Sequence, residues 1–162
     1  MRTFFSFPNP VNELAARTVA AGVVVLALTA AVTLWTPVVV VLAAGFVGRL
    51  LAGPRLSPLG WVAQRVIAPR LGPARLVPGP PKRFAQGIGA TLTVAATVAL
   101  LLDAPAVTLV LLGVLVIAAS LEAFAGFCLG CWMFGRLQAV GLVPASVCEA
   151  CNDIRLRRTA TV

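Results

Sequence analysis

Long apolar stretches dominate the chain. Four of them, near residues 14–35, 37–52, 84–102 and 105–126, are of the length that crosses a bilayer, which takes about 20 helical residues. Short turns join the first to the second and the third to the fourth, and Pro37 and Pro105 suit helix starts. The pattern predicts an all-α polytopic membrane protein with four transmembrane helices in two hairpins. We expect residues 1–162 to form a single membrane domain.

Residues 53–83 separate the two predicted hairpins and are rich in basic side chains. Within them "SPLGWVAQRVIA" predicts a short amphipathic interfacial helix, ended by prolines on both sides. Trp61 suits the depth of the headgroups. The expected apolar face of this helix comprises Leu59, Val62, Val66 and Ile67. Just before this loop, Arg49 is expected to extend its guanidinium to the headgroups from the shortest span.

Charge is sparse and one-sided. Only 11% of the residues are charged, against roughly 25% in soluble domains. All 13 Lys and Arg residues lie outside the two short turns, and basic residues mark the cytoplasmic side. The sequence therefore predicts a multi-pass plasma-membrane protein with both termini in the cytoplasm and its basic loop on anionic headgroups. It shows no aromatic-interleaved basic patch of the kind that binds nucleic acid.

Two C-x-x-C pairs fall in the predicted cytoplasmic tail, residues 127–162. Cys128 and Cys131 precede Cys148 and Cys151, with sixteen residues between the pairs. The cytoplasm keeps thiols reduced, so permanent structural disulfides are not expected there. Two interpretations remain open. The spacing matches structural zinc sites with four thiolate ligands, and it equally suits dithiols that cycle between oxidised and reduced states.

The redox interpretation rests on local environment. Ser146 and Glu149 form a capping box, which predicts a short cytoplasmic C-terminal helix with Cys148 in its first turn. The helix dipole there should give Cys148 the lowest thiol pKa of the four, with Cys151 as its resolving partner. Cys128 and Cys131 are expected to extend the fourth span. We expect the tail to fold back and bring the two pairs within about 10 Å of each other.

Glu122 is an acid inside the fourth apolar stretch. An ionisable group at such a depth costs roughly 2.5–3.5 kcal/mol and marks a candidate functional site. It is a candidate proton acceptor for the thiols, or a partner for Arg49 or Arg136. Together with a faint repeat that superposes Pro37 on Pro105, it also leaves a small transporter as a third interpretation.

Several motifs carry a family resemblance. "FPNPVNE", "GPRLSPLG", "APRLGP", "GPPKRFAQGIG" and "GFCLGC" occur in this order between Phe7 and Asp153. They resemble the bacterial membrane proteins grouped as domain of unknown function 4395. The resemblance implies a membrane companion of thioredoxin-like proteins or rhodanese-type sulfurtransferases, particularly in actinobacteria. It gives Cys128 and Cys131 the role of the family's cysteine motif, although Trp132 stands where a polar residue is expected.

The combined prediction is a membrane protein with a cytosol-facing centre of two C-x-x-C pairs. Its expected function is thiol-disulfide or sulfane-sulfur exchange with a thioredoxin-like or sulfurtransferase partner. The main alternative is a non-catalytic membrane scaffold in which zinc is bound by all four thiolates, those of Cys128, Cys131, Cys148 and Cys151.

Overall fold

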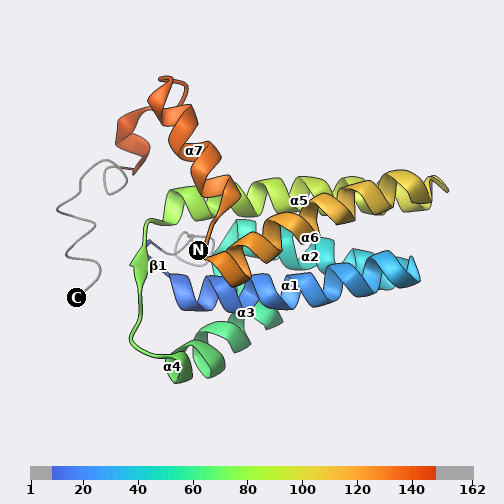
Figure 1. Ribbon diagram of the computed structural model, residues 1–162, viewed down its shortest axis with the longest axis horizontal. Coiled ribbons are helices and arrows are strands. Elements are labelled where there is room, and N and C mark those ends of the chain that lie inside the picture. Colours follow the sequence, from blue (N-terminus) through green and yellow to red (C-terminus); the bar gives the residue numbers. More distant parts are fainter. Residues whose placement is uncertain (1–8, 149–162) are drawn as a thin grey trace.

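Four long helices lie side by side along the long axis of the molecule (Figure 1). The computed structural model describes residues 9–148. The long helices are α1 (Glu13–Thr33), α2 (Thr36–Ala52), α5 (Gly79–Leu101) and α6 (Pro105–Ala125). The shorter elements are β1 (Val11–Asn12), a 3₁₀ turn (Gly53–Leu56), α3 (Pro58–Val62), a π-helical turn (Ala63–Ile67), α4 (Ala68–Leu71), β2 (Leu76–Val77), α7 (Leu129–Ala139) and a 3₁₀ turn (Ala145–Cys148).

The long helices occupy the predicted apolar stretches. The side chain of Asn12 caps α1 by accepting the Leu14 N–H at 3.0 Å, and Leu34 ends the helix in the left-handed conformation (φ 49°). Prolines in the first turns of α2 and α6 start those helices as expected. The helix α5 begins at Gly79 rather than at Phe84, because prolines also fit its first turn. Lys82 therefore belongs to a helix and not to a loop.

The helices pack across the two predicted hairpins. The most extensive contacts join α1 to α6 and α2 to α5, whereas α1 and α2 touch less. The hydroxyl of Thr108 in α6 donates to the carbonyl of Ala96 in α5 at 3.3 Å, a bond between the two helices of the predicted second hairpin. A Cβ at Gly89 of α5 would overlap the ring of Phe46 in α2. The arrangement as two separate hairpins is thus not confirmed.

The outer surface of the bundle is apolar. The helices α1, α5 and α6 are long and apolar enough to cross a membrane, yet only 39%, 28% and 22% of their most apolar stretches is buried. Val110 and Ile117 of α6, for example, are 66% and 64% exposed. Water disfavours so much exposed apolar surface, whereas lipid accommodates it. The chain is therefore a multi-pass membrane protein. The helix α2 has 17 residues, and its crossing stays a prediction.

The connection between α2 and α5 covers one end of the bundle. A helical run from Pro58 to Leu71 confirms the predicted helix, but Pro69 does not end it. The π-helical turn just before Pro69 widens the helix where the ring needs room. The buried residues of the whole helical run are Gly60, Ala63 and Ala68, while Val62 of the predicted apolar face is 38% exposed.

A short antiparallel pairing of β1 with β2 was not predicted. It brings Val11 opposite Val77 and ties the start of α1 to the start of α5. The N–H of Glu13 also donates to the carbonyl of Arg75 at 2.7 Å. Two-residue strands carry too few side chains to give a periodic signal in the sequence.

Candidate functional site

The helix α6 ends before the first cysteine pair. Gly126 adopts the left-handed conformation (φ 68°), and its N–H bonds to the carbonyl of Leu121. Arg17 of α1 binds the last carbonyls of the helix, donating from Nε to Ala123 at 3.2 Å and from Nη2 to Phe124 at 3.0 Å. A left-handed glycine and a cation at the helix end are common helix terminators. The prediction that Cys128 and Cys131 extend the fourth span is therefore wrong.

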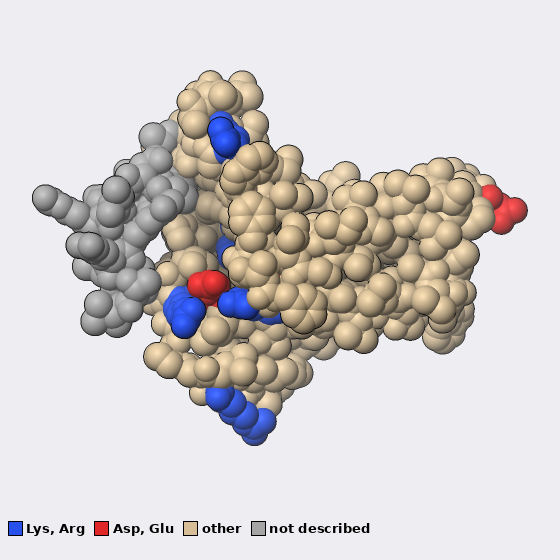
Figure 2. Space-filling model, viewed as in Figure 1, with Lys and Arg blue, Asp and Glu red and all other residues tan. Residues whose placement is uncertain are grey.

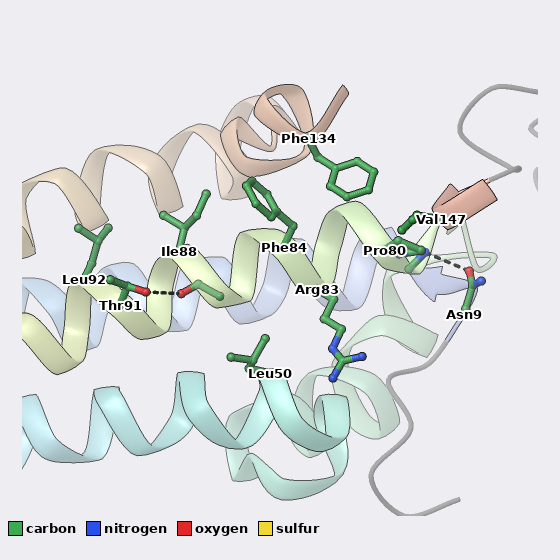
Figure 3. Close-up of a pocket in the computed structure, with 12 residues that line it drawn as sticks. Asn9, Leu50, Pro80, Arg83, Phe84, Ile88, Thr91, Leu92, Phe134 and Val147 are labelled. Carbon is green, nitrogen blue, oxygen red and sulfur yellow. Dashed lines mark hydrogen bonds between the residues drawn. The ribbon is translucent and has the colours of Figure 1, made fainter. Parts of the chain in front are cut away.

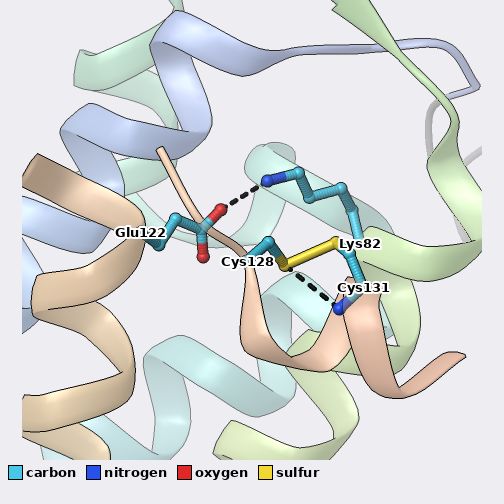
Figure 4. The surroundings of a disulfide bond; sticks show 4 residues. All are labelled: Lys82, Glu122, Cys128 and Cys131. Carbon is cyan, nitrogen blue, oxygen red and sulfur yellow. Dashed lines mark hydrogen bonds and ion pairs between the residues drawn. A yellow bond between two sulfur atoms is a disulfide. The ribbon is translucent and has the colours of Figure 1, made fainter. Parts of the chain in front are cut away.

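Cys128 and Cys131 instead begin a new helix and form a disulfide. Cys128 is the N-cap of α7, and its Sγ accepts the Cys131 N–H at 3.3 Å (Figure 4). Their Cα atoms lie 5.2 Å apart. Unpaired N–H groups at a helix start stabilise a thiolate once such a pair is reduced. The electrostatic advantage that the sequence assigned to Cys148 is thus present at Cys128.

The first turn of α7 lies directly on α5. A Cβ at Gly130 would stand 2.6 Å from Cβ and 2.7 Å from Cα of Ala85, which shows how closely the two backbones approach. One turn later, the rings of Phe84 and Phe134 meet with centroids 5.7 Å apart and planes inclined by 59°. Only glycine at position 130 allows the first turn of α7, which carries the disulfide, to pack this closely against α5.

Gly130→Ala should destabilise the protein by about 1–3 kcal/mol, the usual cost of overpacking. The added Cβ meets the backbone of Ala85, which cannot rotate away. Gly135→Ala is the matched control, because it lies on the same helix with nothing within 4 Å of the new Cβ. Denaturant unfolding in detergent gives the free energy of unfolding of both variants. Equal values would contradict the close approach of α7 to α5.

Glu122 forms a largely buried ion pair with Lys82. Nζ of Lys82 donates to Oε1 of Glu122 at 2.5 Å, and the two side chains are only 10% and 17% exposed (Figure 4). The predicted partners, Arg49 and Arg136, are both wrong. Sequence reasoning placed Lys82 in a loop, whereas the early start of α5 carries it into the bundle beside α6. The missed signal was the pair of prolines in the first turn of α5, which let the helix begin five residues earlier, at Gly79.

Arg49 is buried inside the protein, at 5% exposure, and does not reach the surface. Its Nε donates to Gln86 Oε1 and its Nη1 to Ser57 Oγ, both at 3.0 Å. Its guanidinium lies 4.5 Å from the centre of the Phe46 ring. The expected extension to the headgroups is wrong because the turn and helix after α2 fold back over this side chain.

The described residues border three spaces. A cavity of about 90 Å³ inside the bundle is lined by Arg49, Gln86, Glu122 and Cys128, among others. A groove of about 900 Å³ lies outside, between α5 and its neighbours, with Leu50, Arg83, Phe84 and Phe134 on its walls (Figure 3). A third space, of about 60 Å³, borders Arg49 and Gln86 but no cysteine. Of these three spaces among the described residues, only the inner cavity borders a cysteine.

The second cysteine pair lies at the edge of the described chain. A 3₁₀ turn begins at Ala145, so Ser146 lies inside it and does not cap it. The N-cap role predicted for Ser146 is therefore wrong. The turn contacts α5. Cys148 is the last residue of the turn, and Glu149 and Cys151 lie outside the described residues, so the approach of the two pairs stays a prediction.

No group of three or more His, Cys, Asp and Glu side chains is placed to hold a metal ion within residues 9–148. The two ligands that Cys128 and Cys131 would supply are joined as a disulfide, a form that offers no thiolate to a metal. The other two belong to the tail pair. The four-cysteine zinc site therefore stays a prediction.

A family model described as Domain of unknown function (DUF4395) matches residues 11–139. The chain belongs to the DUF4395 family. The match includes Arg49, Lys82, Glu122, Cys128 and Cys131, and it ends before the tail pair. In this DUF4395 chain the first pair thus lies within the family's own domain, and the second follows it. No curated protein and no solved structure matches the chain.

Proposed function

We propose that the protein is a membrane dithiol–disulfide exchanger whose working centre is the Cys128–Cys131 pair. The observation that carries the proposal is the disulfide at the start of α7, bridging the N-cap and the third residue of the helix. A disulfide in this position is readily opened, because the helix start favours the thiolate that opening releases. The neighbouring Lys82–Glu122 pair supplies a carboxylate for proton transfer.

The exchange needs only a partner with two thiols. A partner thiolate forms a bond to Cys128 Sγ, the S–S bond breaks, and Cys131 leaves as a thiolate. The second partner thiolate then displaces Cys128 and closes the partner's own disulfide. Two electrons pass to the protein, and the protons released by the partner end on the Cys128 and Cys131 thiolates, with Glu122 as an intermediate acceptor. Run in reverse, the same steps oxidise the protein.

The surface beside the pair suits a protein partner. Phe127 and Trp132 flank the two cysteines and are 43% and 49% exposed. The guanidinium of Arg136 stacks 5.1 Å from the centre of the Trp132 ring, which adds positive charge to this surface. A soluble thioredoxin-like protein, or a sulfurtransferase that offers two reactive thiols, is the partner that this chemistry fits. The variant that captures such a partner is Cys131→Ser.

The proposal places this centre at the cytoplasmic face of the plasma membrane, with four helices crossing the bilayer. Basic side chains gather at one end of the bundle, and an acidic side chain marks the opposite tip, where α5 joins α6 (Figure 2). Such a division follows the preference of Lys and Arg for the cytoplasmic side. The helix α7 lies at the basic end (Figures 1 and 2), and the disulfide is at its start.

Cysteine labelling in intact cells tests this orientation. In a background with all four native cysteines replaced by serine, a cysteine at position 35 or 103 should react with a membrane-impermeant thiol reagent added outside. A cysteine at position 75 should react only after the cells are opened. Labelling of position 75 from outside would show that the protein has the opposite orientation, with the disulfide on the oxidising side of the membrane.

A further inference from the structure

Arg49 carries a buried positive charge with an incomplete set of partners. Two of its nitrogens donate to Gln86 and Ser57, but Nη2 is buried and has no hydrogen-bond partner among the described residues. A charged donor left without an acceptor in a low-dielectric interior is strongly unfavourable. The position therefore requires a further acceptor, and a negatively charged one fits best.

Arg49 borders two cavities, and only the inner one also borders Cys128. The inner cavity measures about 90 Å³ and is bordered by Arg49, Gln86, Glu122 and Cys128. The carboxylate of Glu122 is neutralised by Lys82, so Arg49 leaves the cavity with a net positive charge. The volume exceeds the roughly 10–15 Å³ that one water needs, yet it is too small for a cofactor or a drug-sized ligand, whose pockets start at about 300 Å³. The occupant that fits is a small anion.

Cys128 determines what such an anion can do. It borders the cavity and is joined to Cys131 in a disulfide, which reacts with sulfur nucleophiles. We propose that this cavity binds a small sulfur anion, hydrosulfide or sulfite, and presents it to the disulfide. The inference rests on the proposed exchange at the Cys128–Cys131 pair and names a substrate class for it.

The reaction is balanced without any other oxidant. The sulfur of the anion forms a bond to Cys128 Sγ, the S–S bond breaks, and Cys131 leaves as a thiolate in the first turn of α7. The product at Cys128 is an S-sulfonate from sulfite or a persulfide from hydrosulfide. Two electrons pass from the anion's sulfur to Cys131, so the disulfide is the oxidant. Arg49 acts as a binding residue that holds the negative charge.

Sulfite added to the oxidised, full-length protein in detergent tests the proposal. Mass spectrometry of peptides should find the S-sulfonate on Cys128 and a free thiol on Cys131. Arg49→Gln should slow its formation by at least about tenfold, the loss expected when a hydrogen bond to a charged group is removed. Ala118→Leu, which keeps Arg49 but fills the cavity from another wall, should slow it similarly. Arg83→Gln, on the outer groove, is the control and should react like the wild type.

Two further reagents separate the outcomes. Sulfate, which has a similar charge but is not a nucleophile, should inhibit sulfite in the wild type and not in Arg49→Gln. An uncharged phosphine should reduce every variant at the same rate, which shows that each is folded and accessible. If phosphine and a thioredoxin-like protein open the disulfide but Arg49→Gln leaves the sulfite rate unchanged, the anion site is wrong and the exchange function stands. If none of these reagents opens the disulfide, the exchange function falls as well.

Discussion

Replacing Cys131 by serine is expected to trap Cys128 in a mixed disulfide with a thioredoxin-like protein in cells. In the wild type Cys131 reverses that bond by attacking Cys128 from within the same helical turn, where the two Cα atoms are 5.2 Å apart. Serine lacks the nucleophile, so the intermediate should change from an undetectable to a major species. Denaturing electrophoresis without reductant, after rapid alkylation, detects the adduct, and mass spectrometry identifies its partner.

Two other serine variants give this result its meaning. Cys128→Ser removes the cysteine that caps α7 and should trap little or nothing. Cys151→Ser is the matched variant in the tail pair, and on the sequence-based order of reactivity it would trap the partner on Cys148. A stronger adduct from Cys151→Ser than from Cys131→Ser would make the tail the entry point and leave the pair on α7 as a second station.

The apolar stretches were sufficient to predict the long helices. Burial of a continuous apolar segment in lipid requires every backbone group to be paired within the segment, so length and hydropathy nearly determine a helix. The ends were also largely predictable, since Pro37 and Pro105 fit only the first turn of a helix. Pairing of the helices was not, because the apolar side chains of α1 and α6 are spread over all faces of each helix and carry no directional signal.

The site was predicted in its composition but not in its geometry. The sequence singled out Cys128 and Cys131, yet treated "GFCLGC" as the end of a span. The ending of α6 depends on a left-handed Gly126 and on Arg17, which is distant in the sequence and reaches the last carbonyls only in the folded bundle. The glycine was a readable signal for a helix end. The arginine was not, because no local pattern reports a contact across more than one hundred residues.

The same limitation applies to the buried charges. Arg49 and Lys82 were both assigned to the headgroup region, where basic side chains near span ends usually lie. In the folded protein Ser57 and Gln86 each accept one hydrogen bond from Arg49, and Glu122 pairs with Lys82. Each of these partners comes from a different element, so the sequence could show the cost of burying the charge but not what offsets it.

Removing one partner of the Lys82–Glu122 pair should strongly destabilise the bundle. Lys82→Met leaves a carboxylate and Glu122→Met leaves an ammonium, each largely buried, and such single changes cost about 3–5 kcal/mol. The double variant replaces both charges by apolar side chains and should be close to the wild type. Unfolding of all four proteins in detergent gives the coupling free energy directly. Arg83→Met, at the exposed neighbouring position of α5, is the control and should cost little.

The double variant also separates the two roles of Glu122. If its carboxylate only balances Lys82, the double variant should keep both its stability and its rate of exchange with a dithiol partner. If the carboxylate also accepts a proton from the thiols near Cys128, the double variant should fold normally but exchange more slowly, and the deficit should shrink as rising pH ionises the thiols without help. If the double variant is destabilised by the sum of the two single costs, the ion pair contributes nothing to the stability of the bundle. If the double variant is stable and its pH–rate profile matches that of the wild type, Glu122 takes no part in the chemistry.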